Sequence, residues 1–271
     1  MPQKEESFWN PYRMVVVRDN EPKKKKPVLH HAFKGISGTV NCRITTLTPF
    51  LIGKRSDRGV SFVEREGKPV IPGTSLKGMI RSLAELAGNG CAVVGKSDNN
   101  HKPCSSIDSL CITCRIFGMM EKGRNAKVFM GKISFGDGIF QGDTPVYGKH
   151  QILMGTPAPR HTAFYKNPDT GNDDKTVRKF YFHQPRQEDY PLPPPADLIK
   201  NVWRVYPLPK DSIFEFEITF HNLCDEELKL LLYCLALKKM LPLLLKINRK
   251  HKALCVTNLA MENLWEWVAF I

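Results

Sequence analysis

Residues 71–88 read IPGTSLKGMIRSLAELAG, and this stretch decides the fold. After the Pro-Gly turn, the hydroxyl of Thr74 or Ser75 can accept the free amide hydrogens at the start of a helix. Apolar side chains then recur at helical spacing and predict one buried stripe, made of Leu76, Ile80, Leu83 and Ala87. A helix with one apolar stripe packs against another layer, so sheet strands are expected on either side of it in the sequence.

The start of this helix also carries a basic pair. Lys77 and Arg81 lie one helical turn apart, beside the amides expected at Gly73, Thr74 and Ser75. A helix N-terminus with a flanking lysine suits a phosphate group. A solvated charged face explains the same pattern, so these five residues are phosphate-contact candidates that need independent support.

The flanking segments alternate as strands do. Residues 39–48 read TVNCRITTLT, residues 127–140 read KVFMGKISFGDGIF, and residues 212–220 read SIFEFEITF. Residues 225–238 predict a second amphipathic helix, whose inward positions are Leu228, Leu231, Leu232 and Leu235. The order strand, helix, strand, insertion, strand, helix predicts an α+β fold. One further strand would complete a ferredoxin-like, RRM-type βαββαβ unit.

The composition favours a polyanionic partner. The chain has 271 residues, 42% of them apolar, and a formal net charge of +13. Because this charge is spread along the chain, nucleic acid ranks ahead of membranes or acidic proteins. No apolar run reaches the roughly 18 residues of a membrane span, and residues 1–6 show no signal core. We therefore expect an intracellular, cytoplasmic protein without a membrane partner.

Four of the eight cysteines fall within 24 residues. Cys91, Cys104, Cys111 and Cys114 have the spacing C-x12-C-x6-C-x2-C. Intracellular thiols stay reduced, and four thiolates fill the tetrahedral shell of Zn²⁺. His101 is an alternative ligand, and a chance cluster of small buried residues is the bland explanation. Structural zinc is the prediction, with no open position for zinc chemistry.

The helix motif has a known counterpart. The string IPGTSLKGMIRSLAE, followed by CITCRIFG and GKISFGD, resembles the RAMP superfamily of CRISPR-associated proteins, which serve antiviral defence. It is most similar to backbone subunits of type III effector complexes, and NPYRMVVV, TVNCRITTLTPFLIG and RKFYFHQ strengthen the likeness. Together these strings span about Asn10 to Leu237.

The resemblance implies a function and partners. It implies an RRM-like palm, a thumb hairpin inserted in it, and subunits stacked along a guide RNA that pairs with single-stranded target RNA. The partners would be these RNAs and other effector subunits. The guide-contact candidates are then the Gly73–Arg81 corner, with Lys54 and Arg55 in the glycine-flanked basic loop of residues 53–59. Lys179, Phe180 and His183 suit a base-stacking platform, although a buried hairpin core would explain the aromatic residues equally well.

The resemblance also sets expected boundaries. A basic arm covers residues 1–37, with a four-lysine run at Lys23–Lys26 that is either solvated or in contact with phosphate. The palm covers residues 38–240 and holds the zinc loop at 89–126 and the thumb insertion at 141–210. An atypical tail covers residues 241–271.

The resemblance also raises the question of RNA cleavage. Several family members cut target RNA with an aspartate in the loop after the first strand, where this chain has Asp57 between two arginines. A carboxylate there would bind a divalent ion such as Mg²⁺ or accept the hydroxyl proton. The family aspartate often lies nearer the helix, so a solvated charge is an equal explanation. A guide-processing ribonuclease that uses His161 or His183 is the alternative enzyme.

The tail departs from the family. Relatives end in a glycine-rich segment of the type HKxGxGKPLGxGS, but residues 248–271 contain no glycine. Back-translated in another frame, the tail reads H-K-(P/S)-G-Y-G-K-P-L-G-M-G-S-V. Our hypothesis is a frameshift between about Leu237 and Lys246. The chain would then lack a phosphate-contact loop and the last palm strand, and would be a non-functional product.

Overall fold

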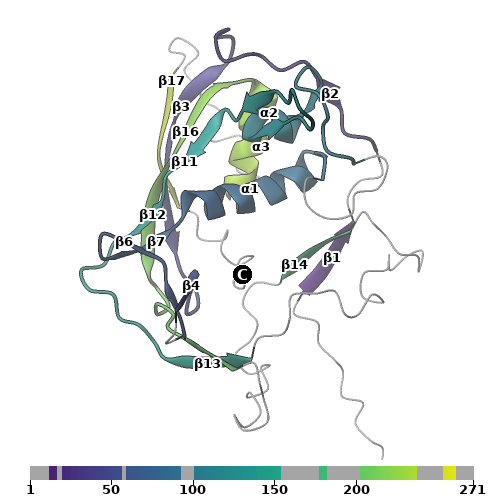
Figure 1. The fold of residues 1–271 in the computed structure, drawn as a ribbon. Helices are drawn as coiled ribbons and strands as arrows, with labels where there is room; N and C mark the ends of the chain where they lie inside the picture. Colours follow the sequence, from purple (N-terminus) through teal and green to yellow (C-terminus); the bar gives the residue numbers. More distant parts are fainter. Residues whose placement is uncertain are drawn as a thin grey trace, which may run out of the picture.

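The structure of the chain is a computed structural model. It describes residues 12–16, 20–56, 59–92, 101–153, 177–181, 202–236 and 253–260. The fold is α+β, as predicted, with strands predominating (Figure 1). No helix in the described part of the chain has the length and apolar character that a membrane crossing requires.

The main sheet has the strand order β17-β3-β16-β12-β7-β6, and β11 also pairs with β16. Its centre is β3 (Ile36–Thr45) and β16 (Ile213–Leu223), which pair antiparallel with Cys42 opposite Phe216. Alternate side chains of both strands are buried, which confirms the alternation read from the sequence. The inward members are Val40, Cys42, Ile44, Phe214, Phe216, Ile218 and Phe220.

The predicted single strand over residues 127–140 is wrong. The segment forms β10 (Val128–Met130), β11 (Ile133–Phe135) and β12 (Gly138–Phe140). Phe135 pairs with Ile218 and Ile139 with Glu215, so three residues on one strand face two on the other. This is a bulge, and bulges re-aim side chains. The alternation of apolar residues concealed it because the glycines on either side of Asp137 read as ordinary strand positions.

Two helices cover one face of this sheet (Figure 1). They are α1 (Gly73–Ala87) and α3 (Asp225–Ala236), and all four predicted leucines of α3 are buried. The buried stripe of α1 runs through Gly73, Leu76, Ile80 and Ala84, whereas Ala87 is exposed, contrary to prediction. The predicted cap is also wrong: Pro72 precedes the helix without a side-chain hydrogen bond, and Thr74 and Ser75 lie exposed in its first turn.

The edge strands complete the layer. β12 joins β7 (Lys68–Ile71), which pairs with β6 (Glu64–Arg65). At the opposite edge, β17 (Ala253–Ala260) runs parallel to β3. The order β17-β3-β16-β12 is that of a ferredoxin-like unit, but the last strand of such a unit runs antiparallel to the first. The direction of β17 therefore departs from the predicted βαββαβ palm.

A second sheet has the order β13-β15-β5-β4. The predicted flexible loop over residues 53–59 is instead the start of a hairpin, formed by β4 (Gly53–Ser56) and β5 (Gly59–Phe62). β13 (His150–Leu153) and β15 (Val202–Val205) come from the two ends of the predicted insertion. Gly59 has φ +133°, and a Cβ there would lie 2.4 Å from the Arg204 carbonyl oxygen, so only glycine fits.

The cysteine-rich segment forms a small module beside the helices. It contains β8 (Leu110–Cys111), α2 (Ile112–Phe117) and the hairpin of β9 (Gly118–Met120) with β10. Part of the predicted basic arm joins it, because β2 (Lys24–Lys25) pairs with β8. Another part, β1 (Tyr12–Val16), pairs with β14 (Val177–Tyr181).

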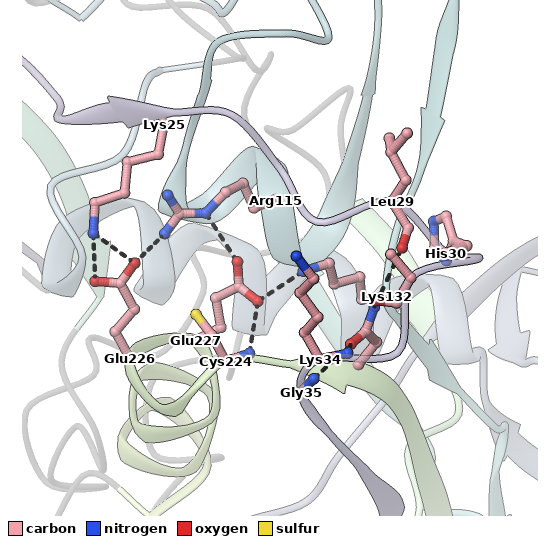
Figure 2. Close-up of polar contacts among 12 residues, drawn as sticks. Lys25, Leu29, His30, Lys34, Gly35, Arg115, Lys132, Cys224, Glu226 and Glu227 are labelled. Atoms are coloured by element: carbon pink, nitrogen blue, oxygen red, sulfur yellow. Dashed lines mark hydrogen bonds and ion pairs between the residues drawn. The ribbon is translucent and has the colours of Figure 1, made fainter.

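A buried ion cluster fastens this module to α3 (Figure 2). Glu227 accepts from Arg115 Nε at 2.9 Å, from Lys132 Nζ at 2.9 Å and from the Cys224 amide at 3.1 Å. The Arg115, Lys132 and Glu227 side chains are all at most 5% exposed. At the rim, Glu226 accepts from Arg115 and Lys25, and the hydrogen bond from Lys25 is the main reason that its pKa is lowered.

Removing the central carboxylate is expected to destabilise the protein. In a Glu227→Gln variant, the buried Lys132 loses its counter-charge and Arg115 keeps only Glu226 at the rim, so the free energy of unfolding should fall by about 3 kcal/mol. The matched Glu226→Gln change, at a half-exposed site, should cost about 0–1 kcal/mol. Urea denaturation measures both, and equal losses would contradict the central role of Glu227.

Candidate functional site

The four predicted zinc ligands meet at one point. The sulfur atoms of Cys91, Cys104, Cys111 and Cys114 all lie within 4.8 Å of one another, and all four residues are buried. Cys111 and Cys114 lie at the start and within the first turn of α2, so the short helix presents both sulfurs to the same side. Four sulfurs about 2.3 Å from one ion would lie about 3.8 Å apart, so this cluster has the size that tetrahedral zinc needs.

Backbone amides donate hydrogen bonds to these sulfurs. The amide of Cys91 donates to Cys111 Sγ at 3.5 Å, that of Cys111 to Cys104 Sγ at 3.3 Å, and that of Cys114 to Cys111 Sγ at 3.5 Å. The contacts among the four thiols lower the pKa of Cys111 and raise the pKa of Cys91 and of Cys114, so the proton is shared unequally among the sulfurs. Electron-rich sulfurs that accept hydrogen bonds suit a cation, so the residues fit Zn²⁺.

His101, the alternative ligand, is outside the four-sulfur cluster. It is buried, its Nε2 lies 3.1 Å from Asn89 Oδ1, and its carbonyl accepts from the Ala92 amide. These contacts join the two sides of the loop that carries Cys91 and Cys104. The group of four cysteines therefore remains the metal-ligand candidate, and His101 lies next to it.

The start of α1, the predicted phosphate site, already holds a carboxylate. The Gly73 amide donates to Asp137 Oδ1 at 2.8 Å, and Arg65 pairs with the same carboxylate. A Cβ on Gly73 would lie 2.3 Å from the Phe135 carbonyl oxygen, so glycine lets the helix approach the bulged strand. The carboxylate occupies the position that favours an anion. Sequence reasoning missed Asp137, although its two flanking glycines were a signal of a bulge.

The basic pair on α1 is divided between two environments. Arg81 donates to Glu85 at 3.2 Å and to the Gly118 carbonyl at 3.4 Å, and one guanidinium nitrogen lies 4.0 Å from Cys114 Sγ. It is thus directed toward the cysteine module. Lys77 is partly buried, and burial first, then the charge of Arg81, lowers its pKa. Lys77, with the exposed Thr74 and Ser75, is the part of the predicted corner that faces solvent.

The remaining candidates lie elsewhere. Lys54 and Arg55 are exposed on β4, where the Arg55 guanidinium carbon lies 4.3 Å from the Trp203 ring centroid. Lys179 and Phe180 are in β14, opposite Met14 and Arg13 of β1. The candidates Asp57, His161 and His183 lie outside the described residues, so their roles stay predictions from the sequence. Trp203 was not predicted; its only signal was an aromatic residue beside an arginine in a short apolar strand.

Comparison with known families agrees with the motif strings. The family described as "RAMPs: RAMP superfamily" matches residues 43–248, which is more than half of the 271 residues. The chain belongs to the RAMP superfamily. The matched range of this RAMP protein includes α1, the four cysteines, the second sheet and α3.

Among solved structures, this RAMP protein resembles a chain of the "Cryo-EM structure of the Type III-B Cmr-beta bound to cognate target RNA". The TM-score is 0.36 and the sequence identity 16%, over 72% of this chain and 49% of that chain. This RAMP protein thus spans about half the length of the chain it matches. None of the curated proteins matches it.

The cysteine cluster predicts a measurable zinc content. We expect purified protein to carry about one zinc ion per chain, and a Cys114→Ser variant to lose it. Cys234→Ser is the matched control, because Cys234 is a buried cysteine of α3 outside the cluster. A chelator should lower the thermal midpoint of wild type and of Cys234→Ser. The prediction would be contradicted if the wild-type protein contained no zinc and its thermal midpoint did not change with chelator.

Proposed function

We propose that this RAMP protein is an RNA-binding subunit of a type III CRISPR ribonucleoprotein and holds guide RNA through its phosphate backbone. The observation that carries the proposal is membership of the RAMP superfamily over residues 43–248. The strings IPGTSLKGMIRSLAE, CITCRIFG and GKISFGD add the likeness to type III backbone subunits. The partners in this proposal are guide RNA, target RNA and neighbouring RAMP subunits.

The charge of the chain supports backbone binding. A net charge of +13 attracts any RNA, whatever its sequence. A guide-holding subunit needs this property, because the sequence of the guide varies while the protein does not. The phosphate contacts give affinity and register, and base pairing within the RNA supplies the specificity.

The sheet and helices support a ferredoxin-like palm. β3, α1, the β11–β12 strand, β16 and α3 follow one another in the order of a βαββα unit, with both helices on one face. In this proposal the zinc loop, supported by the four-sulfur cluster, braces α2 against α1. Zinc would be structural, since protein sulfurs fill all four positions.

Lys77 is the residue through which the corner is proposed to bind RNA. A Lys77→Ala variant should bind single-stranded RNA more weakly and reduce the slope of log affinity against log salt by about 0.7, the value for one lost phosphate contact. Asp137→Asn should have the opposite effect on affinity, because it removes a negative charge while its amide oxygen still accepts from Gly73. Fluorescence anisotropy titrations at several salt concentrations measure both.

Lys229 provides the matched control for Lys77. It is an exposed lysine of α3, so Lys229→Ala removes the same charge at a site outside the corner. We expect its affinity and salt slope to stay at the wild-type values. Equal effects of the two lysine variants would mean that only net charge matters, and the corner would lose its role.

A frameshifted, non-functional product is the second candidate, and the direction of β17 favours it. β17 is parallel to β3, where a ferredoxin-like palm has an antiparallel edge strand. We expect a re-read of the gene to show a shifted frame between the codons of Leu237 and Lys246, and the frame-restored protein to bind RNA more tightly. An uninterrupted frame, with relatives that share the Trp265 ending, would refute this candidate.

A further inference from the structure

The second sheet, β13-β15-β5-β4, carries the guide-contact candidates Lys54 and Arg55 on β4, outside the corner at Lys77. β4 and β5 form a hairpin, β15 runs parallel to β5, and β13 runs antiparallel to β15. β4 and β13 lie at the opposite end of the molecule from α2 and β2 (Figure 1). A function found here is therefore separate from the cysteine module.

Every charged side chain in these four strands is basic. The strands read GKRS, GVSF, VWRV and HQIL, so no Asp or Glu occurs in them. Lys54, Arg55, Arg204 and His150 are all exposed, and the exposed Lys149 directly precedes β13. Strands of a solvated sheet ordinarily mix charges, and like charges on neighbouring strands repel. Within the four described strands, this concentration of basic side chains favours an anionic ligand.

The register sorts these side chains onto two faces. Arg55 is opposite Val60, and Val60 is opposite Val205, so these residues and Trp203 share one face. Lys54 and Arg204 belong to the other face, and both are exposed. The sheet thus presents Arg55 on the face that carries Trp203 of the interior strand β15, and Lys54 and Arg204 on the opposite face.

The contact between Arg55 and Trp203 resembles what an unpaired base would make. The guanidinium carbon lies 4.3 Å from the ring centroid, so the planar cation covers one face of the indole. A nucleobase is also planar and stacks on aromatic rings at similar spacing. Because the arginine is an exposed side chain on β4, it can move from the ring to a phosphate without breaking a buried ion pair.

We propose that this sheet is a second RNA-binding surface, in which Trp203 stacks with one unpaired base of single-stranded RNA. The base takes the position that Arg55 covers, and Arg55, on the same face of the sheet, binds a flanking phosphate. This inference rests on the proposed function, RNA binding, and adds a base-stacking site to it. Stacking is indifferent to base identity, so the surface accepts any sequence. It excludes duplex RNA, because paired bases do not expose their faces.

The test uses the full chain and three labelled probes of equal length. These are a mixed-sequence single-stranded oligoribonucleotide, the same strand with abasic sites at every position, and its duplex. Binding is measured by fluorescence anisotropy. Trp203→Ala should weaken binding of the single strand at least about fivefold, the lower range for one stacked base. It should leave the abasic strand unaffected, because that probe has no base to stack.

Three further variants separate base stacking from folding and from phosphate binding. Trp203→Phe keeps an aromatic ring in the sheet and should restore most of the affinity that Trp203→Ala loses. Tyr233→Ala removes an aromatic side chain of α3 that is 40% exposed, and its affinity should equal that of wild type. Arg55→Ala should weaken binding of the single strand and of the abasic strand alike, since the proposal gives Arg55 a phosphate.

The outcomes distinguish this inference from the proposed function. If wild type binds none of the probes, the proposed function fails and the second surface fails with it. If wild type binds the single strand but Trp203→Ala binds it equally well, the stacking site is refuted while the RNA-binding function stands. A fivefold loss that is the same on the abasic probe also refutes it, because the ring would then act through the fold.

Discussion

The buried carboxylate of Glu227 is the contact that holds the parts of this protein in register. Arg115 comes from α2, Lys132 from the turn between β10 and β11, and Glu227 from the first turn of α3 (Figure 2). Charges at this depth are stable only when each has an oppositely charged partner, because an unpaired buried charge has lost its hydration without compensation. The three segments therefore meet at one carboxylate, which fixes the position of the cysteine module on the helical layer.

That position connects the cysteine module to α1. The α2 helix supplies both Arg115 to the ion cluster and Cys114 to the four sulfurs, so one short helix joins the two. Arg81 of α1 points at the same sulfur and at the Gly118 carbonyl that ends α2. A metal at the cysteines would thus brace the helix whose opposite end forms the proposed RNA corner. In our proposal such a metal would support RNA binding and would not be a centre of reaction.

The two proposed RNA contacts rely on different physical chemistry. At the start of α1, Asp137 already satisfies the Gly73 amide, so affinity there depends on the charge of Lys77 against that of Asp137. In the second sheet, the four described strands contain no acidic residue, and the Trp203 ring lies beside Arg55. The corner therefore suits phosphate alone, whereas the sheet suits a phosphate and an unpaired base together. Both are indifferent to sequence, as a subunit that holds variable guides requires.

The sequence by itself determined the elements whose signals are local. Periodicity of 3.6 gave α1 and α3, alternation gave β3 and β16, and cysteine spacing gave the four metal-ligand candidates, because each signal lies within a short window. The tertiary structure alone decided that Asp137 caps Gly73 from 64 residues away, that Arg81 turns to Cys114, and that Arg55 covers Trp203. These contacts depend on a bulge, a register and a strand order. Such features arise from pairing between distant segments, which no local pattern of residues encodes.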